Sequence, residues 1–395
     1  MRSINFYSSL EVDKSLTVKY DFNPYYCGIG SSLDDPIIVD GKEFINLASN
    51  NYLGLAADKR VIHAIVEAAK EYGASMCGTP IATGSMLLFK RLESRLSEFV
   101  GLEDSVIFPS GYQANCALFV SLAQPGDLIL IDHYAHASLI QGVRLSGAKI
   151  KPFLHNNPGH LKKLLQMASD YRQVFVVTES VFSTEGTIAP FDEIGSLCAE
   201  YDALPVIDDS HGIGVLGKTG RGILEEKCVQ NFTGVYTASL GKAFANAGGF
   251  ISGNKRLIDY LKYTCPGLIY STALTPCTLA GIEAVLDIID KEFSEISGRM
   301  WEYKQMISNG LMDNGFCLTE GKAPITSILV RDLEECARLA KAIHSHRILA
   351  TPFVPPSVPP HENKIRLIAG ANLSRGSVLK ATEIFKKIAK DLNLS

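Results

Sequence analysis

The chain has 395 residues, of which 46% are hydrophobic, and a formal net charge of -4. Its length suggests roughly two to three domains, and its composition is that of an ordinary soluble globular protein. Because the chain has no excess or long run of basic residues, its charge gives no reason to expect a nucleic-acid partner.

The apolar and cysteine patterns narrow the class of protein further. No apolar run approaches the roughly 20 residues that span a bilayer, and the N-terminus lacks the apolar segment of a signal peptide, so we expect no membrane span. The nine cysteines are scattered, with neither a C-x-x-C pair nor metal-ligand spacing. This usage favours a reduced, cytoplasmic location and predicts no metal site.

The N-terminal part is expected to hold little regular structure. Residues 1–45 show no sustained periodicity and predict an arm that ends in a small hairpin, turning at Asp40-Gly41-Lys42. The polar segment 49–55 follows; it is favoured as a loop, with a ligand pocket as the alternative. Amphipathic helices are then expected at 60–72 and 87–100. The stretch between them, 78–85, is expected to be a loop.

From residue 105 the pattern becomes a regular alternation of strands and helices. The expected strands are 105–108, 128–131, 149–153, 174–178 and 204–207, and the helices that precede the last four are 112–122, 138–146, 160–167 and 192–203. This alternation predicts a mostly parallel sheet with helices on both faces. In such sheets, ligands bind at the carboxyl ends of the strands.

Polar residues follow four of these strands. Gly111 and Tyr112 open a helix whose backbone N–H groups suit a phosphate, and His136 follows the second strand. The segments 179–183 and 208–211 follow the fourth and fifth strands. Each could serve only as a helix cap or a structural histidine, but four such groups on one rim predict a binding site.

Lys242 follows a further β-type run at 234–236 and lies among small residues. We interpret it as the amine that binds a carbonyl cofactor, because a lysine forms a Schiff base only when a partly desolvated pocket lowers its pKa. Ser239 offers a hydroxyl for a phosphate, and the glycine pair at 248–249 is expected to let the backbone approach a flat ring. From this stretch alone, a surface loop lysine is equally favoured.

The remainder of the chain predicts a smaller α/β domain. Its expected elements are helical stretches at 278–288 and 295–309, a strand at 327–330, a helix at 333–345, a strand at 364–368 and a helix at 377–392. A proline-rich segment, 351–360, leads to Arg366. We therefore divide the chain into an arm with a hairpin (1–45), a large cofactor-binding domain (46–285) and a small C-terminal domain (286–395).

A glycine-rich segment, 212–219, matches the P-loop pattern G-x-x-x-x-G-K-[ST]. A P-loop requires a helix that begins at its Lys-Thr pair, whereas Gly220 and Gly222 follow here, and each glycine costs a helix about 1 kcal/mol. We expect a tight turn after the fifth strand instead. Nucleotide binding remains the alternative from a different class.

Together these residues resemble the α-oxoamine synthase family over 44–392. The six motifs that carry the resemblance are 49–55, His136-Ala137-Ser138, 179–186, 208–212, Ser239-Leu240-Gly241-Lys242 and Tyr270-Ser271-Thr272. The resemblance implies the pyridoxal-phosphate-dependent transferase fold type I, an α/β fold with a mostly parallel, seven-stranded sheet flanked by helices. It also implies a homodimer whose active sites lie at the subunit interface.

The resemblance implies a catalytic role for several side chains. Lys242 resembles the Schiff-base lysine that also acts as acid and base, and Asp208 resembles the carboxylate that pairs with the pyridinium nitrogen of pyridoxal 5'-phosphate. His136 resembles the imidazole that stacks on the ring. His211 and Ser183 resemble the groups near the phenolic oxygen of the cofactor.

Two further groups of ligands follow from the same resemblance. The implied phosphate ligands are Gly111, Tyr112, Ser239 and Thr272, the last from the partner subunit. Asn50 and Arg366 resemble the contacts to the carboxylate of the amino acid, for which a guanidinium fork is well suited.

The implied reaction condenses an amino acid with an acyl-CoA, or with another thioester such as an acyl carrier protein, and loses carbon dioxide to give an α-amino ketone. An aminotransferase on the same fold is the alternative. Phe89 stands where the family commonly has a histidine, and Pro80 where an arginine is frequent. We therefore assign neither the amino acid nor the acyl chain from the resemblance.

Overall fold

The computed structural model describes residues 6–10 and 22–392. Much of the expected arm, 1–5 and 11–21, lies outside the described residues. The predicted hairpin is confirmed: β1 (Ile37–Val39) pairs with β2 (Lys42–Asn46) in antiparallel fashion. β2 also pairs in parallel with β11 (Ile348–Leu349), so the hairpin is joined to the C-terminal part of the chain.

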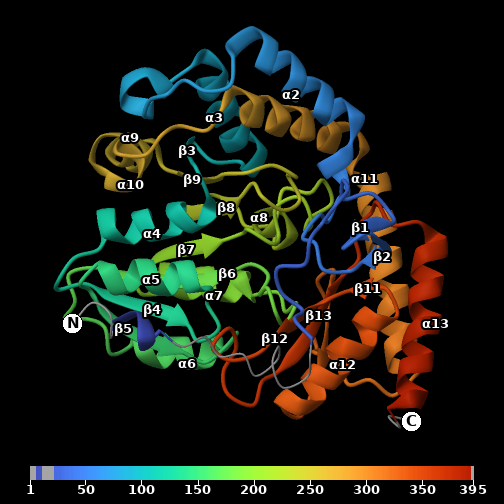
Figure 1. Cartoon of the computed structure of the whole chain (residues 1–395). Coiled ribbons are helices and arrows are strands. Elements are labelled where there is room, and N and C mark those ends of the chain that lie inside the picture. The colour runs from blue at the N-terminus through green and yellow to red at the C-terminus, as the bar shows by residue number, and fades with distance from the viewer. Residues whose placement is uncertain (1–5, 11–21, 393–395) are drawn as a thin grey trace.

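A seven-stranded sheet forms the centre of the larger part of the molecule (Figure 1). Its strands are β3 (Asp104–Phe108), β4 (Leu128–Asp132), β5 (Lys149–Phe153), β6 (Val174–Glu179), β7 (Leu204–Asp208), β8 (Val235–Ser239) and β9 (Gly249–Gly253). The spatial order is β3-β9-β8-β7-β6-β4-β5, and β9 runs antiparallel to both of its neighbours. The predicted fold class, with a mostly parallel seven-stranded sheet, is confirmed.

Alternating strand residues build two hydrophobic layers, one on each face of the sheet. Val106 and Phe108 pack into the layer that contains α4 (Gly111–Leu122), α5 (Ala137–Leu145), α9 (Lys255–Thr264) and α10 (Pro266–Ile269). Ile107 faces the other layer. The helices that pack into that layer include α2 (Lys59–Tyr72), α3 (Leu87–Val100), α6 (Pro158–Leu165) and α7 (Phe191–Glu200). Helices thus cover both faces, as parallel strands require.

One long helix, α11 (Pro276–Met312), connects the sheet to the smaller part of the molecule. It packs against α2 and α3, and further along against α13 (Arg375–Asp391). The two helical stretches expected from the sequence are therefore one continuous helix. Its buried residues belong to the sheet core as far as Met300 and to the smaller core from Tyr303 onward. The division of domains at 285 and 286 falls within this helix and stays a proposal.

The smaller part contains a three-stranded antiparallel sheet of order β10-β13-β12. Its elements are β10 (Ile325–Leu329), α12 (Leu333–Ser345), β12 (Thr351–Phe353), β13 (Lys364–Ile368) and α13. The predicted helix at 333–345 and strand at 364–368 are confirmed to the residue. The strand expected at 327–330 begins two residues earlier, at Ile325.

Several short elements were not expected from the sequence. A π-helical turn, Pro80–Gly84, lies inside the loop expected at 78–85, and a 3-10 turn, Leu55–Ala57, follows the polar segment. α8 (Ile223–Glu226), α9 and α10 were also missed. Over 6–10 and 22–392, no helix has both the length and the apolar character needed to cross a membrane.

Candidate active site

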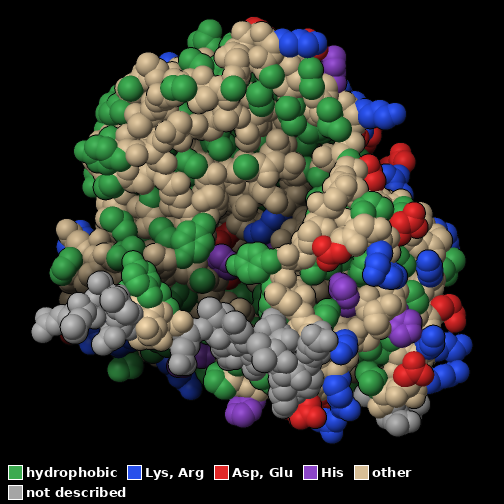
Figure 2. Space-filling view, in the orientation of Figure 1, with side chains coloured by type: hydrophobic (Ala, Val, Ile, Leu, Met, Phe, Trp, Pro, Cys, Tyr) green, Lys and Arg blue, Asp and Glu red, His purple; other side chains and the backbone are tan. Residues whose placement is uncertain are grey.

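A cavity of about 420 Å³ lies at the carboxyl ends of the central strands. Seven of the predicted site residues line it: Gly111, Tyr112, His136, Asp208, His211, Ser239 and Lys242. Figure 2 shows a hollow in one face of the molecule, with basic, acidic and histidine side chains at or beside its base. Ligands bind at the carboxyl ends of parallel strands. The residues expected there, although they come from widely separated segments of the sequence, do lie around one cavity.

Asp208 is the last residue of β7 and lies between two other strand ends. It pairs with Glu179 of β6 on one side and with Thr237 of β8 on the other. Its Oδ2 accepts a hydrogen bond from Asn115 Nδ2 at 2.7 Å, and its Oδ1 accepts one from the backbone N–H of Ser210 at 2.9 Å. The side chain is buried, and each carboxylate oxygen is held by a hydrogen bond.

His136 caps the N-terminus of α5 and is held from two directions. Its backbone N–H donates to Glu179 Oε1 at 2.5 Å, and its ring Nδ1 lies 2.8 Å from Ser138 Oγ. Burial lowers the pKa of His136, so the ring is neutral near neutral pH. Burial, together with the charge of Asp208, raises the pKa of Glu179 well above the usual range.

Lys242 lies in the loop that follows β8, and its side chain is partly buried. Burial lowers the pKa of this amine to about 8, against the opposing effects of the negative charges of Asp208 and Glu179. Roughly a tenth of the amine is therefore unprotonated at pH 7, far more than for an ordinary lysine. This is the property that a lysine needs in order to react with an aldehyde.

His211 and Tyr52 form a buried pair beside this lysine. The Tyr52 hydroxyl lies 2.7 Å from His211 Nδ1, and both side chains are buried. Burial, reinforced by the positive charges of Lys242 and Arg366, holds the pKa of His211 well below its usual value. Tyr52 belongs to the polar segment 49–55, and no feature of the sequence distinguishes it from its neighbours there.

Gly111, Tyr112 and Ser239 meet where α4 begins. The Ser110 side chain caps this helix by accepting from the N–H of Gln113 at 3.0 Å. A Cβ atom on Gly111 would lie 3.0 Å from Ser239 Cβ, so glycine allows the two segments to touch. A helix N-terminus beside a hydroxyl is suited to a phosphate group.

The glycine pair at 248–249 differs from its expected role. Gly248 lines the cavity. Gly249 instead contacts the first residue of α4, because a Cβ atom added to it would lie only 2.4 Å from Gly111 Cα. Gly249 therefore allows a helix, and not a flat ring, to approach β9.

Arg366 and Asn50 do not line the cavity, but each has an unsatisfied polar atom. Arg366 Nη1 donates to the backbone oxygen of Ser183 at 3.1 Å, and its guanidinium lies 4.7 Å from the centre of the Phe353 ring. Among the described residues, buried Arg366 Nε and Asn50 Oδ1 have no hydrogen-bond partner. The charge of Arg366 also lowers the pKa of Lys242, which places the guanidinium within electrostatic reach of the amine.

Ser183 and Thr272 lie outside the cavity lining. Ser183 presents its backbone oxygen to Arg366, and Thr272 is exposed in the segment before α11. A contact of Thr272 with a partner's cofactor stays a prediction, as do the roles implied for the individual residues.

Asn115 was missed by the sequence analysis. Its side chain contacts Asp208, Ser138 and Thr237, at the base of the cavity. It lies inside α4 and not at a strand end, so the rule that found its neighbours did not include it. The available signal was an amide within a mostly apolar helical segment.

Comparisons with known proteins agree with this geometry. The family model for aminotransferase class I and II matches residues 42–385. A putative 8-amino-7-oxononanoate synthase of Bacillus licheniformis is 37% identical over 89% of this chain and 92% of its own length. An 8-amino-7-oxononanoate synthase of Coprothermobacter proteolyticus is 36% identical over 93% of both chains. The chain belongs to the class I and II aminotransferase family.

Solved structures place it more narrowly among the α-oxoamine synthases. A serine palmitoyltransferase of Sphingomonas wittichii superposes with a TM-score of 0.92, at 26% identity, over 96% of each chain. An 8-amino-7-oxononanoate synthase of Francisella tularensis gives a TM-score of 0.76, at 26% identity, over 89% of this chain and 99% of its own. This α-oxoamine synthase is thus a pyridoxal-phosphate-dependent acyltransferase, which condenses an amino acid with an acyl thioester.

The residues of the synthase fit pyridoxal phosphate. The helix N-terminus at Gly111 and the Ser239 hydroxyl suit its phosphate, and the fixed carboxylate of Asp208 suits a protonated ring nitrogen. The lowered pKa of Lys242 suits its aldehyde. Amine, carboxylate and helix terminus line the same cavity.

The glycine-rich segment of the synthase does not form a P-loop. The N–H of Gly217 donates to Glu226 Oε2 at 3.0 Å, and Thr219 donates to Glu225 through its N–H and its hydroxyl. The chain's own carboxylates thus occupy these donors, and Lys218 is exposed. The helix that follows, α8, begins only at Ile223 and has four residues.

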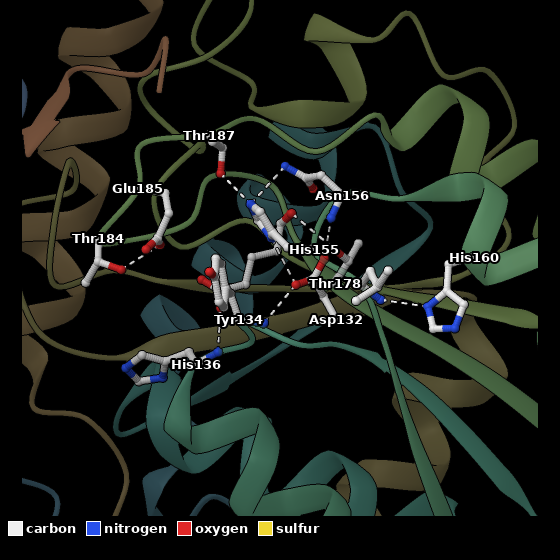
Figure 3. Close-up of polar contacts among 12 residues, drawn as sticks. Asp132, Tyr134, His136, His155, Asn156, His160, Thr178, Thr184, Glu185 and Thr187 are labelled. Carbon is white, nitrogen blue, oxygen red and sulfur yellow. Dashed lines mark hydrogen bonds and ion pairs between the residues drawn. The ribbon is translucent and has the colours of Figure 1, made fainter. Parts of the chain in front are cut away.

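A second polar network lies beside the cavity (Figure 3). Buried Asp132 accepts from His155 Nδ1 at 3.0 Å, and His155 Nε2 lies 2.9 Å from Thr187 Oγ1. Thr187 lies in the loop that follows β6. Glu185 lies in the same loop, and its Oε1 forms an ion pair with Lys364 Nζ at 2.5 Å. The loop that follows β6 is therefore attached both to the large sheet and to β13, which carries Arg366.

Proposed function

We propose that the cavity is the catalytic site of the synthase, with Lys242 as the cofactor-binding amine and Asp208 as the partner of the ring nitrogen. One observation carries this proposal: the amine and the carboxylate line one cavity, at the ends of the adjacent strands β7 and β8. The negative charge of Asp208 acts to raise the pKa of Lys242, against the effect of burial.

Pyridoxal phosphate supplies an aldehyde for an amine and a ring that accepts the electron pair released at the α-carbon of the amino acid. Asp208 keeps a proton on the ring nitrogen, and its two hydrogen-bond donors hold the carboxylate in place. Lys242, with a pKa of about 8, releases and takes up a proton in the working pH range, as a general acid and base requires.

The remaining residues bind and orient. Arg366 and Asn50 would bind the carboxylate of the amino acid. The buried Arg366 Nε, which lacks a partner among the described residues, would donate to that carboxylate, and Asn50 would donate through its amide Nδ2. His136 would stack on the ring. His211 and Ser183 would lie near the phenolic oxygen, with the Tyr52 hydroxyl fixing the His211 ring.

A homodimer would complete the phosphate site. In this assembly Gly111, Tyr112 and Ser239 of one subunit and Thr272 of the other bind the phosphate, with the active sites at the interface. The exposure of Thr272 and of Tyr270, which is 84% exposed, supports a surface that a second copy covers. We also propose a reduced, cytoplasmic location, supported by nine cysteines that are all free in the described residues.

The first product to test is 8-amino-7-oxononanoate, because relatives of 36% and 37% identity carry that name. The acyl donor is proposed to be an acyl-CoA or a carrier-bound thioester. Neither Phe89 nor Pro80, the two departures from the family pattern, lines the cavity; Phe89 is buried in the sheet core and Pro80 lies in the π-helical turn.

Product analysis tests the proposed function. Purified synthase loaded with pyridoxal phosphate is incubated with alanine, glycine or serine and a series of acyl-CoAs, including dicarboxylic ones, while free thiol and product mass are followed. Thiol release with formation of an α-amino ketone is expected for at least one pair. Formation of an oxo acid and pyridoxamine phosphate, without thiol release, would instead indicate an aminotransferase.

A further inference from the structure

Asn115 contacts three polar side chains beneath the cavity, and it is itself only 2% exposed. Its Nδ2 donates to Asp208 Oδ2 at 2.7 Å and to Ser138 Oγ at 2.9 Å, while its Oδ1 accepts from Thr237 Oγ1 at 2.8 Å. Every hydrogen-bonding atom of the amide therefore has a partner, within normal distances. What singles out this amide is that one of its partners is Asp208 and another is the Ser138 hydroxyl beside His136.

The direction of the hydrogen bonds can be followed from Thr237 to the ring of His136. A carboxylate only accepts, so the side of the amide that faces Asp208 must be the NH₂ group. Thr237 then donates to the amide oxygen, which prevents the amide from turning over. Since Ser138 Oγ accepts from Asn115, its own proton is available for His136 Nδ1, 2.8 Å away.

His136 Nδ1 is thereby an acceptor. The backbone N–H of Ser138 also points to this nitrogen, at 3.2 Å, which agrees with an unprotonated Nδ1. In the neutral ring the proton must then lie on Nε2. One amide thus fixes both the carboxylate of Asp208 and the tautomer of His136.

We infer that Asn115 is a positioning residue, which couples the orientation of the Asp208 carboxylate to that of the His136 ring through Ser138. Asn115 lies at the base of the cavity and acts through Asp208 and His136. This inference rests on the proposed function, because it assigns Asp208 to the ring nitrogen and His136 to the face of the cofactor. The network extends over α4, β7, β8 and the start of α5, so it forms only after the sheet has assembled.

The central test compares Asn115→Ala with Ser121→Ala, a control on the same helix. The Ser121 hydroxyl donates to the Ala117 backbone oxygen and lies outside the cavity lining. We expect Asn115→Ala to weaken the binding of pyridoxal phosphate to the cofactor-free protein roughly 10- to 100-fold, the usual effect of losing a hydrogen bond to a charged group. The visible spectrum of the bound cofactor should change as well. Ser121→Ala should match the wild type in both measurements.

Two further variants separate positioning from packing. Thr237→Val removes the donor that orients the amide and should weaken cofactor binding, whereas Thr237→Ser keeps the hydroxyl and should restore it. In the double variant Asn115→Ala/Ser138→Ala, the second substitution should add little, because Ser138 acts through the same network. In turnover, the Asn115 variant should lose kcat, with a nearly unchanged KM for the amino acid.

The outcomes distinguish this inference from the proposed function. If Asn115→Ala folds, binds the cofactor as tightly as Ser121→Ala and gives the same spectrum, Asn115 is not a positioning residue. If Asn115→Ala does not fold, equal binding by Thr237→Val and Thr237→Ser overturns the inference in the same way. A wild-type protein that fails to bind pyridoxal phosphate would refute the proposed function itself.

Discussion

Two Gly-Lys loops follow neighbouring strands of the sheet, and both match a known pattern. Lys218 follows β7 inside a P-loop pattern, and Lys242 follows β8 inside a cofactor-lysine pattern. Lys218 is exposed, and the N–H groups of its neighbours Gly217 and Thr219 donate to Glu226 and Glu225. Lys242 is partly buried, and burial lowers its pKa to about 8. Both lysines match a sequence pattern, so it is the burial of the side chain, and not the pattern, that distinguishes the reactive lysine from the one in a surface turn.

Lys242→Ala should produce the largest loss and would test one side of this comparison. Turnover should fall below detection, because general acid–base catalysis alone contributes roughly 10²- to 10⁴-fold and the covalent link to the cofactor is lost as well. Single-turnover assays and thermal unfolding would check this. Normal kinetics in a folded variant would contradict the assignment.

Asp208→Asn should be nearly as severe, although it keeps the shape of the side chain. The amide cannot stabilise a protonated ring nitrogen, so the cofactor becomes a poor electron acceptor. We expect kcat to fall by at least about 10²-fold, in line with loss of a preorganised charge at the reaction centre. Stopped-flow absorbance would measure the step. Retention of more than half of the activity would exclude Asp208 as the partner of the ring nitrogen.

The pH dependence of cofactor capture should identify the amine without any substrate. Only the neutral amine reacts, and the pKa of Lys242 is lowered to about 8 from 10.5. The rate of reaction with pyridoxal phosphate should therefore rise with pH, level off above about 8, and fall about tenfold for each pH unit below it. Because the charge of Asp208 raises this pKa, Asp208→Asn should move the midpoint downward. A midpoint near that of an ordinary lysine would contradict the lowered pKa.

Arg366→Lys should mainly weaken binding of the amino acid. A lysine keeps the charge but cannot form two parallel hydrogen bonds to a carboxylate. KM should rise roughly 10- to 100-fold, with a smaller change in kcat. Initial-rate kinetics would separate the two parameters, and Arg331→Lys, at an exposed ion pair in the same part of the chain, is the control. Equal KM values in both variants would show that Arg366 does not bind the carboxylate of the amino acid.

Lys218→Ala should have the smallest effect, and it tests whether the exposed lysine of the glycine-rich loop has a function. Substitutions of exposed residues usually change stability by less than about 0.5 kcal/mol, and this side chain lies outside the cavity lining. Activity and thermal unfolding should match the wild type, and calorimetry should detect no ATP binding in either protein. ATP binding that this substitution abolishes would revive the P-loop interpretation.

Much of the sheet, and seven of the residues that line the cavity, could be predicted from the sequence. Apolar runs such as 174–178 predict buried strands, and the polar residues that end them, such as Asp208, are easily found. β9 was missed because its sequence, GFISG, has only two large apolar residues. Its position between β3 and β8 depends on contacts that the order of elements along the chain does not specify.

Asn115 shows a further limit of sequence reasoning. Its role depends on the register that brings Asp208 beside Thr237, and on the packing of α4 against β8, which places Asn115 within hydrogen-bond distance of both residues. A helical asparagine by itself predicts neither. The pairing of Tyr52 with His211 likewise joins residues 159 positions apart and is visible only in three dimensions.

Borohydride reduction of the protein loaded with pyridoxal phosphate, followed by peptide mass spectrometry, is the most direct test of the central claim. Reduction makes the link between the cofactor and its amine permanent. We expect a label on Lys242 and none on Lys218. A label on another lysine, or on none, would contradict it.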